Sequence, residues 1–246
     1  MIRLNAVSFA YGGTGEAVAD VSLHVHPGRL LVLVGANGSG KSTLLSLMAG
    51  LYSPLRGELI VADRVSPGNE KSIRSVSRLV MQDADLQILG GTVGEDLLMG
   101  RRRDEETVDM ARRMAGRFDL LDAWERPVQA LSWGMKRKLC LAAALLDKPS
   151  VLLLDEPFSG LDYHGIREMR AILSENRERG LTQVVSSHDL ESVIDLVDGL
   201  AVMDKGRLVL SGPPEAVLDR VREHGVRPPG SWSIERAILP WDREGA

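Results

Sequence analysis

The sequence predicts an α/β fold with a mainly parallel sheet, and two observations support this prediction. First, short segments typical of strands buried on both faces recur at residues 30–34, 151–154, 182–187 and 200–203. Second, stretches with helical periodicity, such as residues 42–49, separate these segments. Because helices separate consecutive strands, we expect parallel pairing through right-handed crossovers.

Composition limits the classes of function. The chain has 246 residues, one cysteine and a net charge of −4, with both signs interspersed, which argues against a nucleic-acid partner and excludes an internal disulfide. Residues 1–5 contain no apolar stretch typical of a signal peptide. The apolar run Leu139–Leu146 has eight residues, whereas a membrane-spanning helix needs about 20. We therefore expect a soluble cytosolic protein that reaches a membrane only through a partner.

The N-terminal part is expected to form an antiparallel β subdomain. Residues 4–8 and 21–25 alternate between apolar and polar side chains, as half-buried strands do, and a turn at Gly12–Gly15 separates them. Residues 30–34 form the next strand, and the helix at 42–49 ends before Gly50.

The middle of the sequence changes character and predicts a helical insertion at about residues 83–146. Helices are expected there at residues 92–100, 105–118 and 132–146. We therefore expect one domain at residues 1–223 that contains this insertion. A tail at residues 224–246 follows, and its fold is not predicted.

A phosphate-binding loop is predicted at Gly35–Ser42, which fits the pattern GxxxxGK[ST] between a buried strand and a helix. Glycines allow backbone N–H groups to converge on phosphate oxygens, and the helix adds unpaired N–H groups and its positive dipole end. Lys41 is expected to reach the β- and γ-phosphates, and the Ser42 hydroxyl to ligate Mg²⁺. The alternative is a glycine-rich turn without a ligand. The predicted nucleotide-binding residues here are Asn37, Gly38, Ser39, Gly40, Lys41, Ser42 and Thr43.

Two carboxylates follow the strand at residues 151–154. A hydrophobic strand that ends in an acid is the Walker B arrangement of P-loop NTPases, with Asp155 in the Mg²⁺ shell. Glu156, expected on the opposite side of the pleat, is placed to polarise a water for attack on the γ-phosphate. The alternative is an acid that caps the next helix.

This ordered set of motifs resembles the ATP-binding subunit of an ATP-binding-cassette (ABC) transporter over about residues 1–215. The resemblance implies ATP and Mg²⁺ as cofactors. It implies that Tyr11 stacks on adenine, where the alternative is a buried strand tyrosine. It also implies that Gln82, at the end of a strand at residues 79–81, senses Mg²⁺ and the attacking water, while its loop touches a membrane subunit. His188 matches the switch histidine that contacts the γ-phosphate.

The resemblance extends to the segments that meet a second subunit. Leu131–Met135 occupies the signature position, usually LSGGQ, where Ser132 and Gly134 would complete the nucleotide site of a head-to-tail partner. The sequence departs from the pattern at Trp133 and Met135, which puts the efficiency of that contact in question. The alternative is a plain helix cap at Ser132. Ser159–Asp162 matches the D-loop along the dimer interface.

One branch of the family is the most similar. Residues 82–87 hold two glutamines around an acidic pair, and Thr92–Asp96 opens a helix, as in energy-coupling-factor and cobalt/nickel importers. The resemblance implies an ATPase that energises import of a small substrate, a metal ion such as cobalt or nickel or a vitamin, through a separate transmembrane subunit. It implies a second ATPase subunit, identical or paralogous, and a position at the cytoplasmic face of the cell membrane. The alternative is a soluble ABC ATPase whose ATP-driven dimerisation serves a non-transport task.

Other side chains are given structural roles. Residues 101–103 and 136–138 are interpreted as solvated basic helix faces, and Cys140 as a buried core thiol. His24 and His26 face the same way on a strand, but two ligands without a third do not make a metal site.

Overall fold

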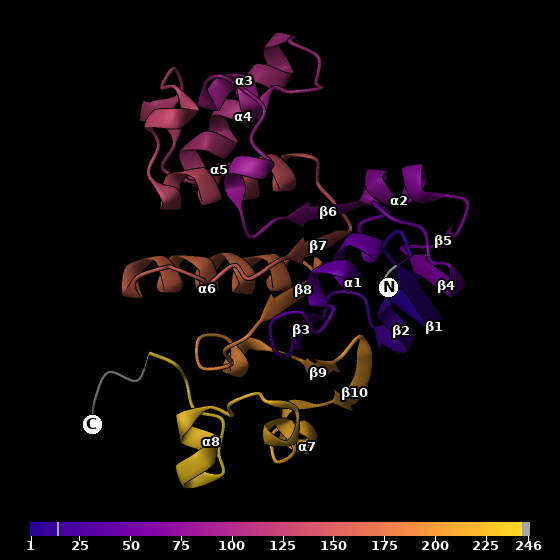
Figure 1. Ribbon diagram of the computed structural model, residues 1–246. Helices are drawn as coiled ribbons and strands as arrows, with labels where there is room; N and C mark the ends of the chain where they lie inside the picture. Colours follow the sequence, from indigo (N-terminus) through magenta and orange to yellow (C-terminus); the bar gives the residue numbers. More distant parts are fainter. Residues whose placement is uncertain (14, 243–246) are drawn as a thin grey trace. The chain divides into compact units, whose positions relative to one another are not determined.

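The computed structural model describes residues 1–13 and 15–242 (Figure 1). Thr14, in the expected turn at Gly12–Gly15, lies outside the described residues. Contacts divide the chain into two compact units, residues 1–79 with 150–246, and residues 80–149.

The first unit contains an antiparallel sheet with the strand order β2-β1-β4-β5. Alternating residues of β1 and β2, such as Leu4 and Val21, are buried, which is the period-two pattern expected for these strands. The sheet confirms the predicted antiparallel β subdomain. Its strands are β1 (Ile2–Ala10), β2 (Glu16–Val25), β4 (Arg56–Val61) and β5 (Arg64–Ser66).

A second sheet has the order β10-β9-β3-β8-β7-β6. The pairs β3–β9, β3–β8 and β7–β8 are parallel, and β10 pairs antiparallel with β9. Every residue of β3, β7 and β8 is buried, as predicted for strands covered on both faces. The strands are β3 (Leu30–Val34), β6 (Ser77–Val80), β7 (Val151–Leu154), β8 (Thr182–Ser187), β9 (Gly199–Asp204) and β10 (Arg207–Gly212).

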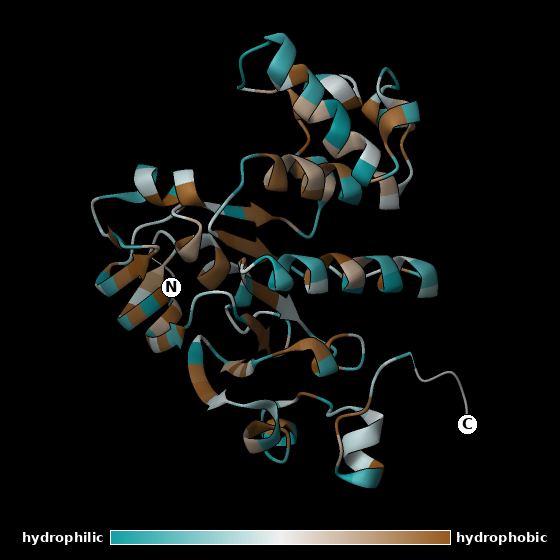
Figure 2. Ribbon diagram, turned by 180° about the vertical axis from the view of Figure 1, so that it is seen from behind, coloured by the Kyte–Doolittle hydropathy of each residue, from teal (hydrophilic) through white to brown (hydrophobic). Residues whose placement is uncertain are grey.

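Helices follow the strands of this sheet and join them through crossovers (Figure 1). The hydrophobic core includes side chains of both sheets and of α1, among them Leu33, Leu45 and Val184. Figure 2 shows this pattern as hydrophobic colour along the strands and mixed colour along α6. The helices of the first unit are α1 (Lys41–Met48), α2 (Glu70–Val76), α6 (Tyr163–Glu178), α7 (Pro214–Val217) and α8 (Gly230–Glu235).

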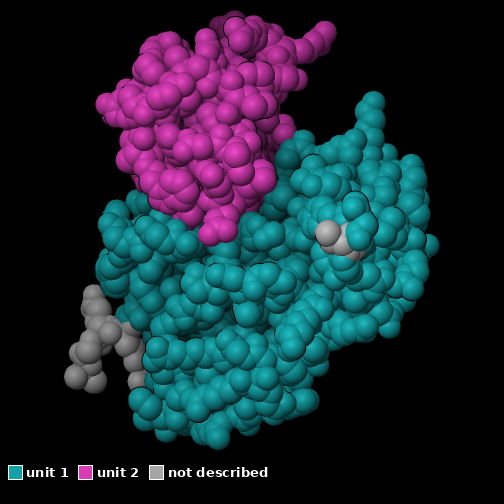
Figure 3. Space-filling model, viewed as in Figure 1, with its two compact units in different colours: residues 1–79, 150–246 teal, residues 80–149 magenta. Residues whose placement is uncertain are grey.

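The second unit, magenta in Figure 3, is helical, as predicted for the insertion. Its helices are α3 (Val93–Leu97), α4 (Glu105–Arg117) and α5 (Trp133–Leu146). The first ends at Leu97 and is shorter than the predicted 92–100, because the backbone leaves the helical conformation at Leu98 and continues as a turn over residues 98–100. Cys140 is buried as expected, and burial raises the pKa of its thiol to about 12.

The prediction of solvated basic faces is wrong for two arginines of this unit. Arg137 is only 4% exposed. Arg101 donates to the Asp147 carboxylate at 2.6 Å and to the Ala143 carbonyl at 3.1 Å, and so ties the segment after α3 to the end of α5. For Arg101 the cause is that its guanidinium finds acceptors on the same unit, so its donors are satisfied locally and not by water.

The described part of the C-terminal tail, for which the sequence predicts no fold, packs on other residues of the first unit. Trp232 of α8 is buried, and its Nε1 donates to Asp219 at 2.9 Å. The Trp241 ring stacks on Tyr163 with centroids 5.0 Å apart. Across the described residues, none of the helices is long and apolar enough to span a bilayer.

Candidate functional site

The loop between β3 and α1 requires glycine at two positions. Gly35 and Gly40 have positive φ angles of 155° and 102°. A Cβ on Gly35 would lie 2.2 Å from the Met203 carbonyl oxygen, and one on Gly40 would lie 2.5 Å from that of Ala17. Side chains at these positions would therefore displace the backbone that shapes the loop.

Lys41 occupies the inside of this loop and is only 6% exposed. Its Nζ donates to the carbonyl oxygens of Gly35 at 2.8 Å and Ala36 at 3.2 Å. The same Nζ lies 3.7 Å from Glu156 Oε1. The ammonium group is thus held within reach of both the loop backbone and the predicted catalytic carboxylate.

The loop residues fit an anion. The N-cap of α1, Gly40, makes no side-chain cap bond, so no side chain of the cap satisfies the first N–H groups of the helix. The hydroxyl of Ser39 is buried, and no described residue forms a hydrogen bond with it. Ser42, in the first turn of α1, is exposed. Unpaired donors around a buried ammonium are the arrangement that a phosphate group satisfies.

Tyr11 lies one residue beyond β1 and is 43% exposed, so the alternative of a buried strand tyrosine is wrong. Its hydroxyl is 3.1 Å from Thr43 Oγ1. The ring packs edge-on against Phe9 and Tyr52, with centroids 5.0 and 5.5 Å away. These contacts bring Tyr11 beside the residue that follows Ser42. Stacking on adenine stays a prediction.

The two carboxylates after β7 are held by a serine that the sequence reasoning missed. Ser186 Oγ donates to Asp155 Oδ1 at 2.5 Å and accepts from the Glu156 backbone N–H at 2.8 Å. Ser186 is completely buried in β8, the parallel neighbour of β7. Its place two residues before His188 is a signal that could have identified it.

Glu156 does not continue the pleat of β7, so that part of the prediction is wrong. The strand ends at Leu154, and Glu156 has a left-handed backbone with a φ of 49°. Left-handed conformation costs a non-glycine residue about 1–2 kcal/mol, and the bond from its N–H to Ser186 helps to hold it. The turn directs the Glu156 side chain into the interior, where the residue is only 7% exposed.

His188 pairs with Glu156 directly. Its Nδ1 lies 2.8 Å from Glu156 Oε2, and its backbone N–H donates to the same oxygen at 3.3 Å. The structure therefore brings together Lys41, Glu156 and His188, which the sequence places far apart. Asp162 of the expected D-loop accepts from Gly165 N at 2.8 Å and caps α6.

Three predicted site residues belong to the second unit. Ser132 caps α5 by accepting from Met135 N at 3.3 Å, and Gly134 has open space where a Cβ would stand. Trp133 is 42% exposed, and the Arg137 guanidinium lies 5.3 Å from its ring centroid. Gln82 is exposed two residues beyond β6, which ends earlier than the predicted strand.

The segment that resembles the importer branch has a local structural basis. Thr92 caps α3 by accepting from Glu95 N at 3.2 Å, which agrees with the predicted start of a helix here. Asp96 Oδ1 accepts from the backbone N–H groups of Leu89 and Gly90 at 2.8 and 2.9 Å. The acid of this element therefore shapes the loop before α3.

Comparison with known proteins identifies the family. The ABC transporter family model matches residues 18–159. The chain is 35% identical over 240 residues to the cobalt import ATP-binding protein CbiO of Rhodobacter capsulatus, covering 93% of this chain and 85% of that protein. It is 32% identical over 237 residues to the energy-coupling factor transporter ATP-binding protein EcfA of Carboxydothermus hydrogenoformans, covering 93% of this chain and 87% of that protein. The chain belongs to the ABC transporter family, as an ATP-binding subunit with ATPase activity.

Solved structures agree with this assignment. CbiO1 of Clostridium perfringens, described as part of an ABC transporter complex, matches with a TM-score of 0.78 and 26% identity over 90% of this chain and 92% of that one. A dimeric ATP-binding cassette bound to ADP and phosphate matches with a TM-score of 0.77 and 23% identity. The match covers 87% of this chain and 98% of that one, and it supports the fold alone. The predicted P-loop NTPase fold is confirmed.

Proposed function

We propose that this chain binds Mg·ATP with the loop at residues 35–43 and hydrolyses it with Glu156 as the general base. The supporting observation is the position of the Glu156 carboxylate, 2.8 Å from His188 Nδ1 and 3.7 Å from Lys41 Nζ. A buried carboxylate between two polar hydrogen donors beside an anion-binding loop is suited to accept a proton from an attacking water.

Each residue has a role in this proposal. Lys41 binds the β- and γ-phosphates, His188 contacts the γ-phosphate, and Tyr11 stacks on adenine. The hydroxyl of Ser42 and the carboxylate of Asp155 would hold Mg²⁺, with Gln82 near it, since oxygen donors suit this hard cation. Bound Mg²⁺ would supply neutralisation of the phosphate charge.

We further propose that the chain works with two partners. A second ATPase subunit, identical or paralogous, would receive Ser132 and Gly134 at its nucleotide, and a separate transmembrane subunit would carry the substrate. The substrate would be small, such as cobalt, nickel or a vitamin, and the name of the CbiO relative, a cobalt import protein, supports cobalt among these. The chain would then lie at the cytoplasmic face of the membrane.

Co-isolation with a candidate transmembrane coupling subunit tests the proposal. We expect a detergent-stable complex whose reconstituted vesicles accumulate substrate only with ATP. The Glu156→Gln complex should assemble equally well but not accumulate substrate. An active ATPase that never binds a membrane subunit would favour the soluble alternative. Equal uptake by the Glu156→Gln complex would refute the catalytic assignment.

A further inference from the structure

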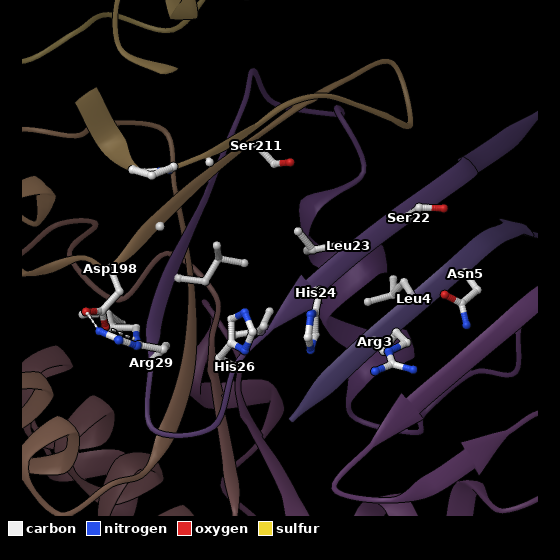
Figure 4. A pocket seen from close by; sticks show the side chains of 16 residues that line it. Arg3, Leu4, Asn5, Ser22, Leu23, His24, His26, Arg29, Asp198 and Ser211 are labelled. Atoms are coloured by element: carbon white, nitrogen blue, oxygen red, sulfur yellow. Dashed lines mark hydrogen bonds and ion pairs between the residues drawn. The ribbon is translucent and has the colours of Figure 1, made fainter. Parts of the chain in front are cut away.

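An open cavity of about 930 Å³ lies in the first unit, away from the phosphate-binding loop (Figure 4). Its lining comes from β1 and β2 of the antiparallel sheet and from β3, β9 and β10 of the other sheet. No residue of the loop at 35–42 lines it. The proposed ATPase function uses none of its residues, so the cavity requires a separate explanation.

The lining carries an excess of positive charge. Arg3 and Arg29 are opposed by one acid, Asp198, so the net charge is +1 with neutral histidines and +3 with both protonated. Asp198 is already shared, because it bonds to Arg29 at 2.9 Å, to Arg177 at 2.6 Å and to Leu30 N at 2.9 Å. Within residues 1–13 and 15–242, no carboxylate lies within 4 Å of Arg3 to form an ion pair.

His24 and His26 lie next to Arg3 in the lining of this cavity. Their ring centroids are 4.3 Å apart, and His24 lies directly opposite Arg3 in the β1–β2 register. Figure 4 shows His26, His24 and Arg3 in a row, with the Arg29–Asp198 pair at the His26 end. Partial loss of hydration, and then the charges of His26, Arg3 and the amino group of Met1, lower the pKa of His24.

This arrangement favours an anion over a metal. A cation would meet Arg3 beside the two imidazoles, and in the described part of the chain no group of three or more His, Cys, Asp or Glu could hold a metal ion. An anion between Arg3 and the imidazoles would instead gain charge-assisted hydrogen bonds. The volume suits a small organic molecule, and Leu23, Leu31 and Pro213 add apolar lining.

We infer that this cavity is a second ligand site, which binds a small organic anion with a carboxylate or phosphate group through Arg3, His24 and His26. Binding of an anion whose own charge stays constant strengthens as pH falls, because the anion favours the protonated form of His24. Of the other groups around the cavity, Arg29 and Arg177 stay charged and Asp198 stays paired with them. The segment from β10, Ser211–Pro213, carries no charge.

The test follows the His24 and His26 ring signals by NMR in the full chain, with citrate as the carboxylate probe and inorganic phosphate as the other. Citrate, phosphate or both should raise the pKa of His24, because a bound anion favours the protonated ring. The Arg3→Met variant should bind about tenfold more weakly. Arg113→Met, which removes an exposed arginine of α4, is the matched control and should bind like the wild type.

The response to the two probes distinguishes a carboxylate site from a phosphate site. Three results would overturn the inference: ring signals that neither probe moves, an equal response in the Arg3→Met variant, or a response to Zn²⁺ or Ni²⁺ but not to the anions. Because Arg3 is exposed, the Arg3→Met variant should unfold at the same urea concentration as the wild type, which a urea titration checks.

Discussion

Ser186 gives the sharpest test of how the fold positions the catalytic carboxylate. Replacing it with alanine removes the bond that Ser186 accepts from Glu156 N at 2.8 Å and the bond that it donates to Asp155 at 2.5 Å. A neutral hydrogen bond contributes about 1 kcal/mol and one to a charged group about 1.5–3 kcal/mol. We therefore expect Ser186→Ala to lower the free energy of unfolding by about 2–4 kcal/mol.

The same change should slow catalysis. Without the serine, the left-handed backbone of Glu156 loses a restraint, so the carboxylate spends less time between Lys41 and His188. We expect kcat to fall about 10- to 100-fold, equivalent to about 1.4–2.7 kcal/mol of barrier. The KM for ATP should change little, because the phosphate-binding loop is intact. Steady-state phosphate release measures the change in kcat and KM, and urea unfolding measures the change in stability.

Ser66→Ala is the matched control for this prediction. Ser66 is also fully buried and donates to a carboxylate, that of Glu70, at 2.7 Å, but it lies in β5. The Ser66→Ala variant should lose a free energy of unfolding comparable to that lost by Ser186→Ala, and its kcat should stay within about twofold of the wild type. If Ser186→Ala were destabilised but kept its kcat, the serine would not position Glu156 and the reasoning would be refuted.

Three further changes test other parts of the account. Met135→Gln restores the amide of the family signature and should raise ATP turnover, whereas Met99→Gln on the same unit should not. Unchanged turnover in Met135→Gln would mean that the substitution is compensated elsewhere. Hydrogen bonds from Ser53 and Ser66 lower the pKa of Glu70 to about 2, so their stabilisation is fully present above about pH 4.5 and is lost as pH falls through 2. Glu70→Gln should therefore flatten the acid dependence of urea unfolding, and an unaltered profile would contradict this cause. Trp241→Ala removes the ring that stacks on Tyr163 and that lies 5.2 Å from the Arg170 guanidinium. It should lower the free energy of unfolding, measured by thermal unfolding, by about 1–2 kcal/mol. An unchanged transition would show that these contacts of the tail do not stabilise the fold.

Sequence reasoning succeeded where local pattern and chemistry agree. The buried runs at β3, β7 and β8 and the glycine-rich loop before Lys41 were predicted because burial and phosphate binding each require those residue types. The family and the P-loop fold followed from the order of the motifs, and comparison confirmed both.

The remaining features depend on contacts between distant residues. Ser186 meets Asp155 and Glu156 only because β8 pairs with β7, and the left-handed turn at Glu156 departs from the pleat that a strand pattern implies. Arg137 was assigned to solvent because its charge is visible in the sequence, while the neighbours that bury it are not. The cationic cavity likewise combines strands from two sheets.

The most direct test of the central claim compares Glu156→Gln with the wild type in ATP binding, ATP turnover and assembly. The account predicts that the variant binds ATP as tightly as the wild type, hydrolyses it at least about 100-fold more slowly, and forms a stable dimer with ATP by light scattering. Monomers alone would contradict the homodimer and favour a paralogous partner. Hydrolysis at the wild-type rate would contradict the assignment of Glu156 as the general base.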